Sequence, residues 1–247
     1  MLWLKALGGL ALARDDSLVT GVLTQRRRLA LLALLAVARE RGVSRDKVVA
    51  WLWPESDAER ARHALNQLLH TQRKLFAPEH LFLGGKTLRL NPAVIRTDVG
   101  EFESALDHGA LEEAVAMWGG PFLDGFFLRD APEFERWAEA QRDRLARRLC
   151  AAYVELAHGA ARQGAGARSA EWWRRAADID PLDSEIAINV VEALAAMGNL
   201  AGAIRHAQLH GERLRNELGM APDARLEACV ARLRTADAPH REQQGRE

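Results

Sequence analysis

Residues 56–90 constrain the fold most strongly, because a helix with one apolar face is followed there by a short hairpin pattern. The segment opens with a capping box, in which Ser56 and Glu59 can satisfy each other's unpaired backbone N–H groups. Alternating residues on both sides of Gly84-Gly85 predict a hairpin with a two-residue turn. Apolar residues recur between these features at the spacing of one buried helical stripe: Ala61, Ala64, Leu65, Leu68, Leu69 and Leu75.

The outward positions of this helix are mostly basic or amide side chains. They are Arg60, Arg62, His63, Asn66, Gln67, His70, Arg73 and Lys74. A polar helix beside a hairpin that carries Lys86 and Arg89 is the arrangement of a winged helix, which places its second helix in the major groove of DNA. The pattern therefore predicts a DNA-binding element.

The preceding residues supply the rest of a winged helix-turn-helix. Leu2 to Ala13 alternates loosely and predicts short strands, and Arg26 to Arg41 predicts an apolar helix that Gly42 ends. Ser44 can cap a second helix, Arg45–Trp53, before Pro54. Residues 1–95 are thus expected to form a winged-helix domain with a small β-sheet, and residues 91–98 a linker.

From Asp98 onward the sequence predicts helices alone. The segment begins with a second capping pattern, Asp98-x-x-Glu101, and a long helix is expected from Pro132 to about Arg162. A 34-residue register that links Ser169 with Ala203 is typical of tetratricopeptide repeats. We therefore expect a mainly α protein, in which an all-α tetratricopeptide-like domain over residues 97–235 is followed by a frayed polar tail, residues 236–247.

The formal net charge of zero conceals an asymmetry along the chain. Residues 1–95 carry 15 Lys and Arg against 8 Asp and Glu, whereas residues 96–247 carry 19 against 26. This split predicts a basic module that faces a polyanion, joined to an acidic module with another role. The two cysteines, the absence of an apolar run of about 18 residues and the absence of a signal-peptide pattern indicate a cytoplasmic protein without a membrane span.

The order and spacing of short phrases along the chain resemble the SARP family of bacterial transcriptional activators, from Leu4 to about Leu233. The phrases are Leu7-Gly8-Gly9-Leu10, Arg28-Leu29-Ala30-Leu31-Leu32, Leu52-Trp53-Pro54, Arg60-Ala61-Arg62 with Leu65, Gly120-Pro121-Phe122-Leu123-Asp124-Gly125-Phe126, Glu133-Phe134-Glu135 with Trp137, Ile179-Asp180-Pro181-Leu182-Asp183 and Glu217-Leu218-Gly219-Met220-Ala221-Pro222. The resemblance implies an OmpR-type winged helix, a tetratricopeptide-like bacterial transcriptional activator domain, and activation through contact with RNA polymerase.

The chain departs from the family pattern in the helix that is expected to enter the major groove. Family members usually carry an arginine near the position of Asn66 and a Leu-Arg-Arg run near the helix end, where this chain has Gln72-Arg73-Lys74. Fewer fixed cations predict weaker phosphate contact or a shifted base preference. The Arg26-Arg27-Arg28 run can supply the missing positive charge.

The expected DNA contacts divide into two groups. Base edges are assigned to His63, Asn66, Gln67 and His70, because Asn and Gln can pair with adenine through two hydrogen bonds. Since one such helix covers few base pairs, we expect a homodimer or tandem binding on repeated half-sites. Phosphates are assigned to Arg26, Arg27, Arg28, Arg62, Arg73, Lys74, Lys86 and Arg89.

Other site chemistries have weaker support. Gly85-Lys86-Thr87 lacks the glycine of a phosphate-binding P-loop at His80, and His206 with His210 have no further metal ligand nearby in the sequence. Without a catalytic constellation, we expect no enzyme, cofactor or metal. The alternative function is a helical scaffold that binds proteins or a small effector and whose winged helix no longer reads sequence.

Overall fold

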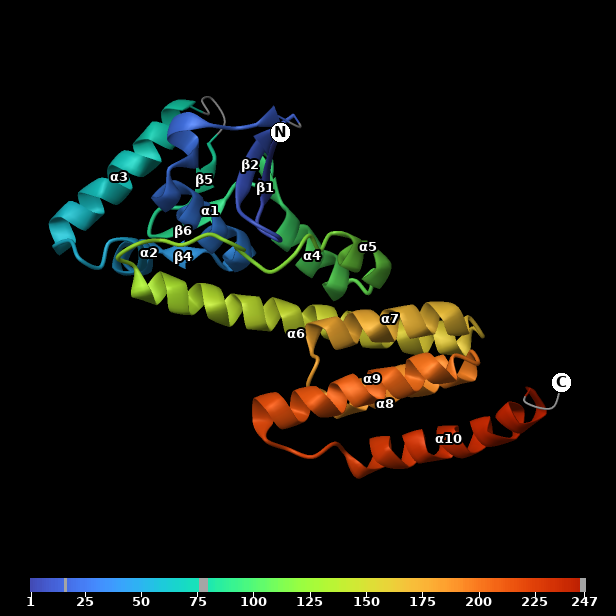
Figure 1. Cartoon of the computed structure of the whole chain (residues 1–247). Helices are drawn as coiled ribbons and strands as arrows, with labels where there is room; N and C mark the ends of the chain where they lie inside the picture. The colour runs from blue at the N-terminus through green and yellow to red at the C-terminus, as the bar shows by residue number, and fades with distance from the viewer. Residues whose placement is uncertain (16, 76–79, 245–247) are drawn as a thin grey trace. The chain divides into compact units, whose positions relative to one another are not determined.

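The structure of the chain is a computed structural model (Figure 1). It describes residues 1–15, 17–75 and 80–244, with the backbone alone at residues 22, 23, 72–75 and 236–244. The fold is mainly helical with small sheets near the N-terminus, which confirms the predicted fold class. The chain divides into two compact units, Met1–Leu145 and Ala146–Glu247, and the division falls within helix α6 (Pro132–Arg162).

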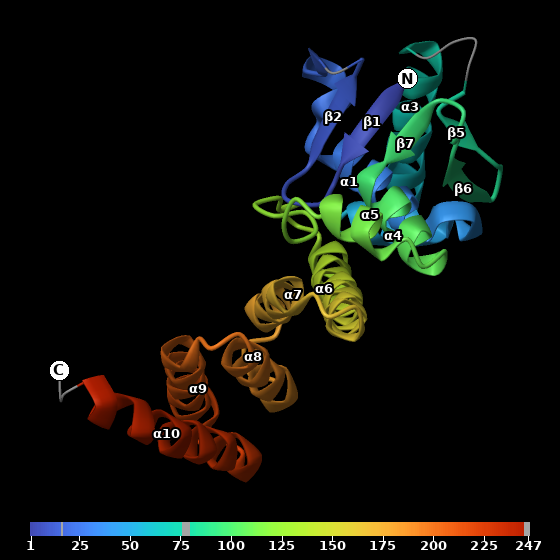
Figure 2. The ribbon, with the colours of Figure 1, turned by 90° about the vertical axis from the view of Figure 1, so that its right-hand side faces the viewer.

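The first sheet of unit 1 has the strand order β3-β2-β1-β7 in the described part of the chain. Strands β1 (Leu2–Lys5), β2 (Ala11–Arg14) and β3 (Ser17–Leu18) pair antiparallel, as expected for short N-terminal strands. Strand β7 (Ile95–Thr97) pairs parallel with β1, and Figure 2 shows the two side by side. The prediction of a linker over residues 91–98 is therefore wrong.

Three helices and a second sheet complete the winged helix. Helix α1 (Arg26–Ala38) is buried at every residue from Leu29 to Val37, as expected of a helix that is apolar on all sides. Helices α2 (Arg45–Leu52) and α3 (Ala58–Leu75) follow, with bounds close to the predicted ones. The second sheet has the order β4-β6-β5.

The wing hairpin differs in its turn from the prediction. Strands β5 (Phe82–Leu83) and β6 (Thr87–Leu90) pair antiparallel, with Leu83 opposite Arg89, and β6 also pairs with β4 (Val43–Ser44). Three residues, Gly84 to Lys86, separate the strands instead of two, and Gly84 has a φ of +91°. A residue with a Cβ at Gly84 would meet the carbonyl oxygen of Thr87 at 2.0 Å, so the tight turn requires glycine there.

Two of the three predicted helix caps are displaced by one residue. Ser44 caps α2 as expected, since its side chain accepts from the backbone N–H of Lys47. At α3 the cap is Asp57, whose carboxylate accepts from the N–H of Arg60, so the box built on Ser56 is wrong. At helix α4 (Asp98–Asp107) the cap is Thr97, not the predicted Asp98.

Asp98 instead joins α4 to the first sheet of unit 1. Its buried carboxylate accepts from the backbone N–H groups of Ala6 and Leu7, each at 2.8 Å, and from that of Val99 at 2.7 Å. Burial raises the pKa of this carboxyl, and the three N–H donors act in the opposite direction. Asp98 therefore binds the backbone that directly follows β1 through its carboxyl group.

The rest of unit 1 packs around an aromatic cluster. Helix α5 (Leu111–Ala116) is followed by a Gly- and Phe-rich loop that leads into α6. Phe122 in this loop is fully buried, its ring meets that of Trp137 in α6 edge-on at 5.8 Å, and its backbone forms an isolated β-bridge with Leu7. Trp137 also lies 5.9 Å from Trp51 of α2, so the loop shares a core with the winged helix.

Unit 2 is built from helices alone in the part of the chain that the structure describes. Helices α7 (Gly166–Ile179) and α9 (Leu200–Arg213) have equal lengths and begin 34 residues apart, which is the period read from the sequence. They are accompanied by α8 (Ser184–Ala196), a π-helical segment (Leu214–Leu218) and α10 (Ala224–Gln244). The tail that was expected to fray after residue 235 is therefore helical to Gln244.

Two adjacent tryptophans of α7, Trp172 and Trp173, are both buried in unit 2. Trp172 stacks on Tyr153 at 5.7 Å, and Trp173 meets His158 edge-on at 4.9 Å. Across the described residues of both units, no helix is long and apolar enough to span a membrane.

Candidate nucleic-acid interface

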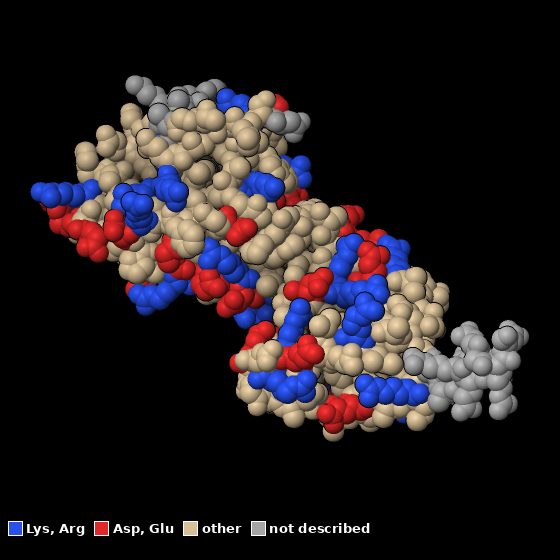
Figure 3. All heavy atoms as spheres, in the orientation of Figure 1, with Lys and Arg blue, Asp and Glu red and all other residues tan. Residues whose placement is uncertain are grey.

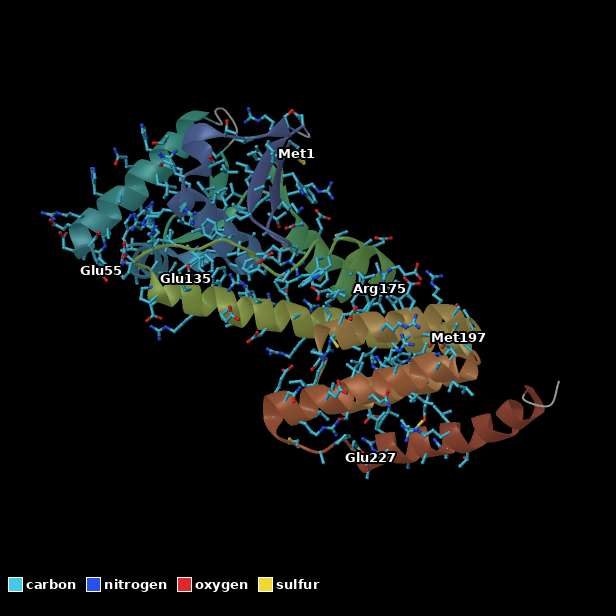
Figure 4. All side chains as sticks on the ribbon, in the orientation of Figure 1. Met1, Glu55, Glu135, Arg175, Met197 and Glu227 are labelled. Atoms are coloured by element: carbon cyan, nitrogen blue, oxygen red, sulfur yellow. The ribbon has the colours of Figure 1, made fainter. Side chains whose placement is uncertain are left out.

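Helix α3 has one face in the core and one face in solvent. Ala61, Leu65, Leu68 and Leu69 are buried, as the spacing predicts. In Figure 4, Glu55 is labelled at the turn that precedes this helix, and side chains stand along its length. The opposite face exposes five of the predicted DNA contacts, Arg62, His63, Asn66, Gln67 and His70, and also Arg60.

The first turn of α2 contacts the outward face of α3. Arg45 donates from Nη2 to Oδ1 of Asn66 at 3.1 Å, and Arg62 forms an exposed ion pair with Asp46 at 3.6 Å. The backbone N–H of Arg45 also donates to the carbonyl oxygen of Lys86 in the wing turn at 3.0 Å. Helix α2, helix α3 and the wing are therefore joined at one place, and Lys86 lies there with its side chain exposed.

Sequence reasoning missed Arg45 as a member of this face. Its partner Asn66 lies 21 residues further along the chain, and no periodic pattern connects the first turn of one helix with the middle of the next. The one available signal was the position of Arg45 directly after the Ser44 cap, where a helix begins beside the turn of a helix-turn-helix.

The wing cation Arg89 lies in a different environment from Lys86. Arg89 is exposed and lines a groove of about 480 Å³ together with Arg39, Arg96 and Glu101. Arg96 is held there by Glu101 at 2.8 Å, and this pairing raises the pKa of the guanidinium and lowers the pKa of the Glu101 carboxyl. Arg89 therefore faces a mixed-charge groove of unit 1.

The Arg26-Arg27-Arg28 run is occupied by contacts within unit 1. Arg26 donates from Nη1 to the carbonyl oxygen of Phe127 at 2.5 Å, and Arg27 donates from Nε to that of Leu52 at 2.9 Å. Arg28 is half-buried, and desolvation lowers its pKa from the ordinary value. Any DNA contact by these arginines has to compete with the partners that hold them.

The remaining two predicted phosphate ligands, Arg73 and Lys74, lie near the end of α3. Only the helical backbone of these two residues is described, and their side chains are not.

The other end of α3 carries charges of both signs. The exposed acids there are Glu55, Asp57 and Glu59, and Asp57 pairs with Arg60 at 3.1 Å. Figure 3 shows Lys and Arg interspersed with Asp and Glu over the visible face of unit 1.

His210, one of the two histidines considered as metal ligands, is held by contacts within unit 2. His210 is buried, with Nδ1 near the carbonyl oxygen of Pro181 and Nε2 near the hydroxyl of Ser184, each at 3.1 Å. No cluster of His, Cys, Asp and Glu among the described residues could hold a metal ion. The exposed polar groups of α2, α3 and the wing turn lie at one place on unit 1.

Comparison with known proteins finds a matching family model and a similar solved structure. Residues 93–234 match the family model described as "Bacterial transcriptional activator domain". A solved structure of EmbR from Mycobacterium tuberculosis, in complex with a low-affinity phosphopeptide, superposes with a TM-score of 0.69 at 23% sequence identity. The alignment covers 95% of this chain and 65% of the EmbR chain, so this chain spans a little under two thirds of that protein. A search of curated proteins gave no match.

Proposed function

Because the chain belongs to the SARP-type family of bacterial transcriptional regulators, we propose that it binds double-stranded DNA in a sequence-specific way through α3. The observation that carries the proposal is the exposed polar face of α3, which α2 and the wing turn flank. A helix of this kind fits the major groove of B-DNA, while the wing lies near the backbone.

The proposed contacts follow the surroundings of each side chain. His63, Asn66, Gln67 and His70 face base edges, since they are exposed in successive turns of α3. Arg62 and Lys86 contact phosphates, and Arg73 and Lys74 extend this set toward the end of the helix. Arg26, Arg27, Arg28 and Arg89 form a secondary set, because phosphate must compete there with contacts within unit 1 or with the mixed charge of a groove.

We further propose a division of labour along the chain, with DNA binding in residues 1–95 and partner contact in residues 97–235. The paired helices of unit 2 repeat with the tetratricopeptide period, and stacked helical pairs present concave surfaces suited to protein partners or a small effector. The partner proposed here is RNA polymerase at a promoter in the bacterial cytoplasm, with activation as the result. Two copies on repeated half-sites would extend the short sequence read by one α3 helix.

Selection of bound duplexes from a random pool by the full-length chain tests the DNA-binding proposal. We expect one enriched motif, and mobility shifts in which that motif binds about 10³-fold or more tightly than random DNA. Affinity should fall steeply with salt, because each neutralised phosphate releases counterions. Absence of an enriched motif would instead support the alternative, a helical scaffold whose winged helix does not read sequence.

A transcription assay tests the proposed partner separately. A promoter that carries the selected motif is transcribed by purified bacterial RNA polymerase, with and without the full-length chain. We expect more transcript in the presence of the chain, and no change on a promoter whose motif is scrambled. Sequence-specific binding without a change in transcript would contradict activation and leave DNA binding in place.

A further inference from the structure

The hydrogen bond between Arg45 and Asn66 determines which atoms the middle of α3 can offer to a base. A guanidinium group can only donate hydrogen bonds. The Asn66 side-chain atom that it contacts at 3.1 Å must therefore be the carbonyl oxygen Oδ1, and the orientation of the amide follows from the chemistry of its partner. The amide nitrogen Nδ2 of Asn66 has no partner among the described residues, and the residue is exposed.

This arrangement disfavours the usual pairing of asparagine and adenine. That pairing requires the amide oxygen to accept from adenine N6 while the amide nitrogen donates to N7. In this chain the Arg45 guanidinium already donates to one of the two lone pairs of the oxygen, and it places further donors beside that oxygen. The pair therefore presents more hydrogen-bond donors than free acceptor positions.

The surroundings of Arg45 define where its guanidinium lies. The backbone N–H of Arg45 is bound to the carbonyl oxygen of Lys86, which fixes the start of α2 against the wing turn. The Nε atom of Arg45 is buried without a hydrogen-bond partner among the described residues, so its N–H is withdrawn from solvent while Nη2 reaches Asn66.

We propose that Arg45 is a specificity-determining residue that, together with Asn66, makes α3 read guanine in place of adenine. Guanine presents two acceptors in the major groove, N7 and O6, which match a pair of donors. The inference rests on the proposed DNA-binding function.

The experiment is binding-site selection with the full-length chain and four variants. The base pair concerned is first identified as the one whose preference is lost in Asn66→Ala. We expect guanine there for the wild type, with a penalty of roughly 5- to 150-fold for the adenine substitution. Arg45→Ala frees the amide oxygen and should move the preference toward adenine. Arg45→Lys still donates to Asn66 and should keep guanine. Asn66→Asp presents acceptors alone and should lose guanine in favour of cytosine.

Two controls separate this role from a structural one. Arg41→Ala removes the same charge from an exposed residue that ends the segment after α1, and it should leave the preferred base unchanged. Helical circular dichroism and the melting temperature report whether Arg45→Ala still folds. If it does not fold, the base preference of Arg45→Lys tests the inference in its place. The inference is overturned if the wild type prefers adenine or if Arg45→Ala retains guanine. Either result leaves the DNA-binding proposal intact. A wild type that selects no sequence overturns both.

Discussion

Residues 1–95 and 96–145 lie in one compact unit, yet they carry opposite charges. The first segment has 15 Lys and Arg against 8 Asp and Glu, and the second has 5 against 12. Residues 146–247 have 14 of each and are neutral. The sequence suggested a basic module joined to an acidic module, whereas the structure places both charges in unit 1. The excess of acid thus belongs to the residues that pack beside the winged helix.

The contacts between these two segments are specific and partly buried. Strand β7 pairs with β1, Asp98 accepts from the N–H groups of Ala6 and Leu7, and Phe122 enters the aromatic core. An acidic segment fixed in this way repels phosphate, so in the proposed complex it restricts which surface of unit 1 can face DNA. The matched family domain begins at residue 93, so its first part has a structural role in the winged helix as well.

Phe122→Ala should produce the largest effect, because it removes a fully buried ring from the core that the two segments share. We expect a loss of about 3–5 kcal/mol in the free energy of unfolding of unit 1. Urea unfolding measures the loss, and hydrogen exchange of the α1 amides shows whether it reaches residues 1–95. Phe127→Ala is the matched control, since that ring is 60% exposed, and it should cost less than about 0.5 kcal/mol. Unchanged exchange in α1 would mean that the two segments unfold independently.

The helices of this fold were predictable, whereas the contacts between segments were not. The bounds of α1, α2, α3 and α6 follow from local patterns of apolar residues and caps that the sequence displays directly. The caps at α3 and α4 were misplaced by one residue because Ser56 and Asp57, like Thr97 and Asp98, are adjacent residues of equally suitable type.

Tertiary partners decided the remaining features. Strand β7 is three residues long, and its parallel partner lies more than 90 residues away, so no local alternation could reveal it. The outward face of α3 could be read from the helical period, but the pairing of Arg45 with Asn66 depends on how α2 is placed beside α3. The exposed face of α3 was therefore predictable, whereas its hydrogen bond with α2 was not.

Asp98→Ala should have the next largest effect, because it leaves the N–H groups of Ala6 and Leu7 buried without an acceptor. We expect a loss of about 2–3 kcal/mol in the free energy of unfolding, measured by chemical denaturation. Glu101→Ala removes a carboxylate from the same helix, but its ion pair with Arg96 is exposed, and it should cost less than about 1 kcal/mol. Equal losses in the two variants would show that Asp98 does not hold the acidic segment to β1.

Arg62→Ala combined with Lys86→Ala tests where the phosphates lie. Each lost contact should reduce the slope of log affinity against log salt by about 0.9, so the double variant should lose about 1.8. Affinity should fall similarly for selected and random DNA, because phosphate contacts carry no direct sequence information. Arg136→Ala in the acidic segment is the control and should leave the slope unchanged, since that side chain pairs with Glu133. A reduced salt slope in the control would mean that the acidic segment also contacts phosphate.

The smallest expected effect is a dependence of stability on pH through Asp98. Burial raises its pKa above the ordinary value of 3.8, so the folded chain takes up a proton more readily than the unfolded chain. Between the unfolded and the folded pKa the native state binds more protons, and stability must therefore fall as pH rises through that interval. Denaturation of the wild type and of Asp98→Asn, measured in steps from about pH 4 to pH 7, isolates this contribution, because the amide does not titrate. We expect the unfolding free energy of the wild type, taken relative to that of the variant, to be highest at the acid end and to fall toward neutral pH. A difference that stays constant across the range, or one that changes in the opposite direction, would mean that the three N–H donors outweigh burial and hold the carboxylate ionised.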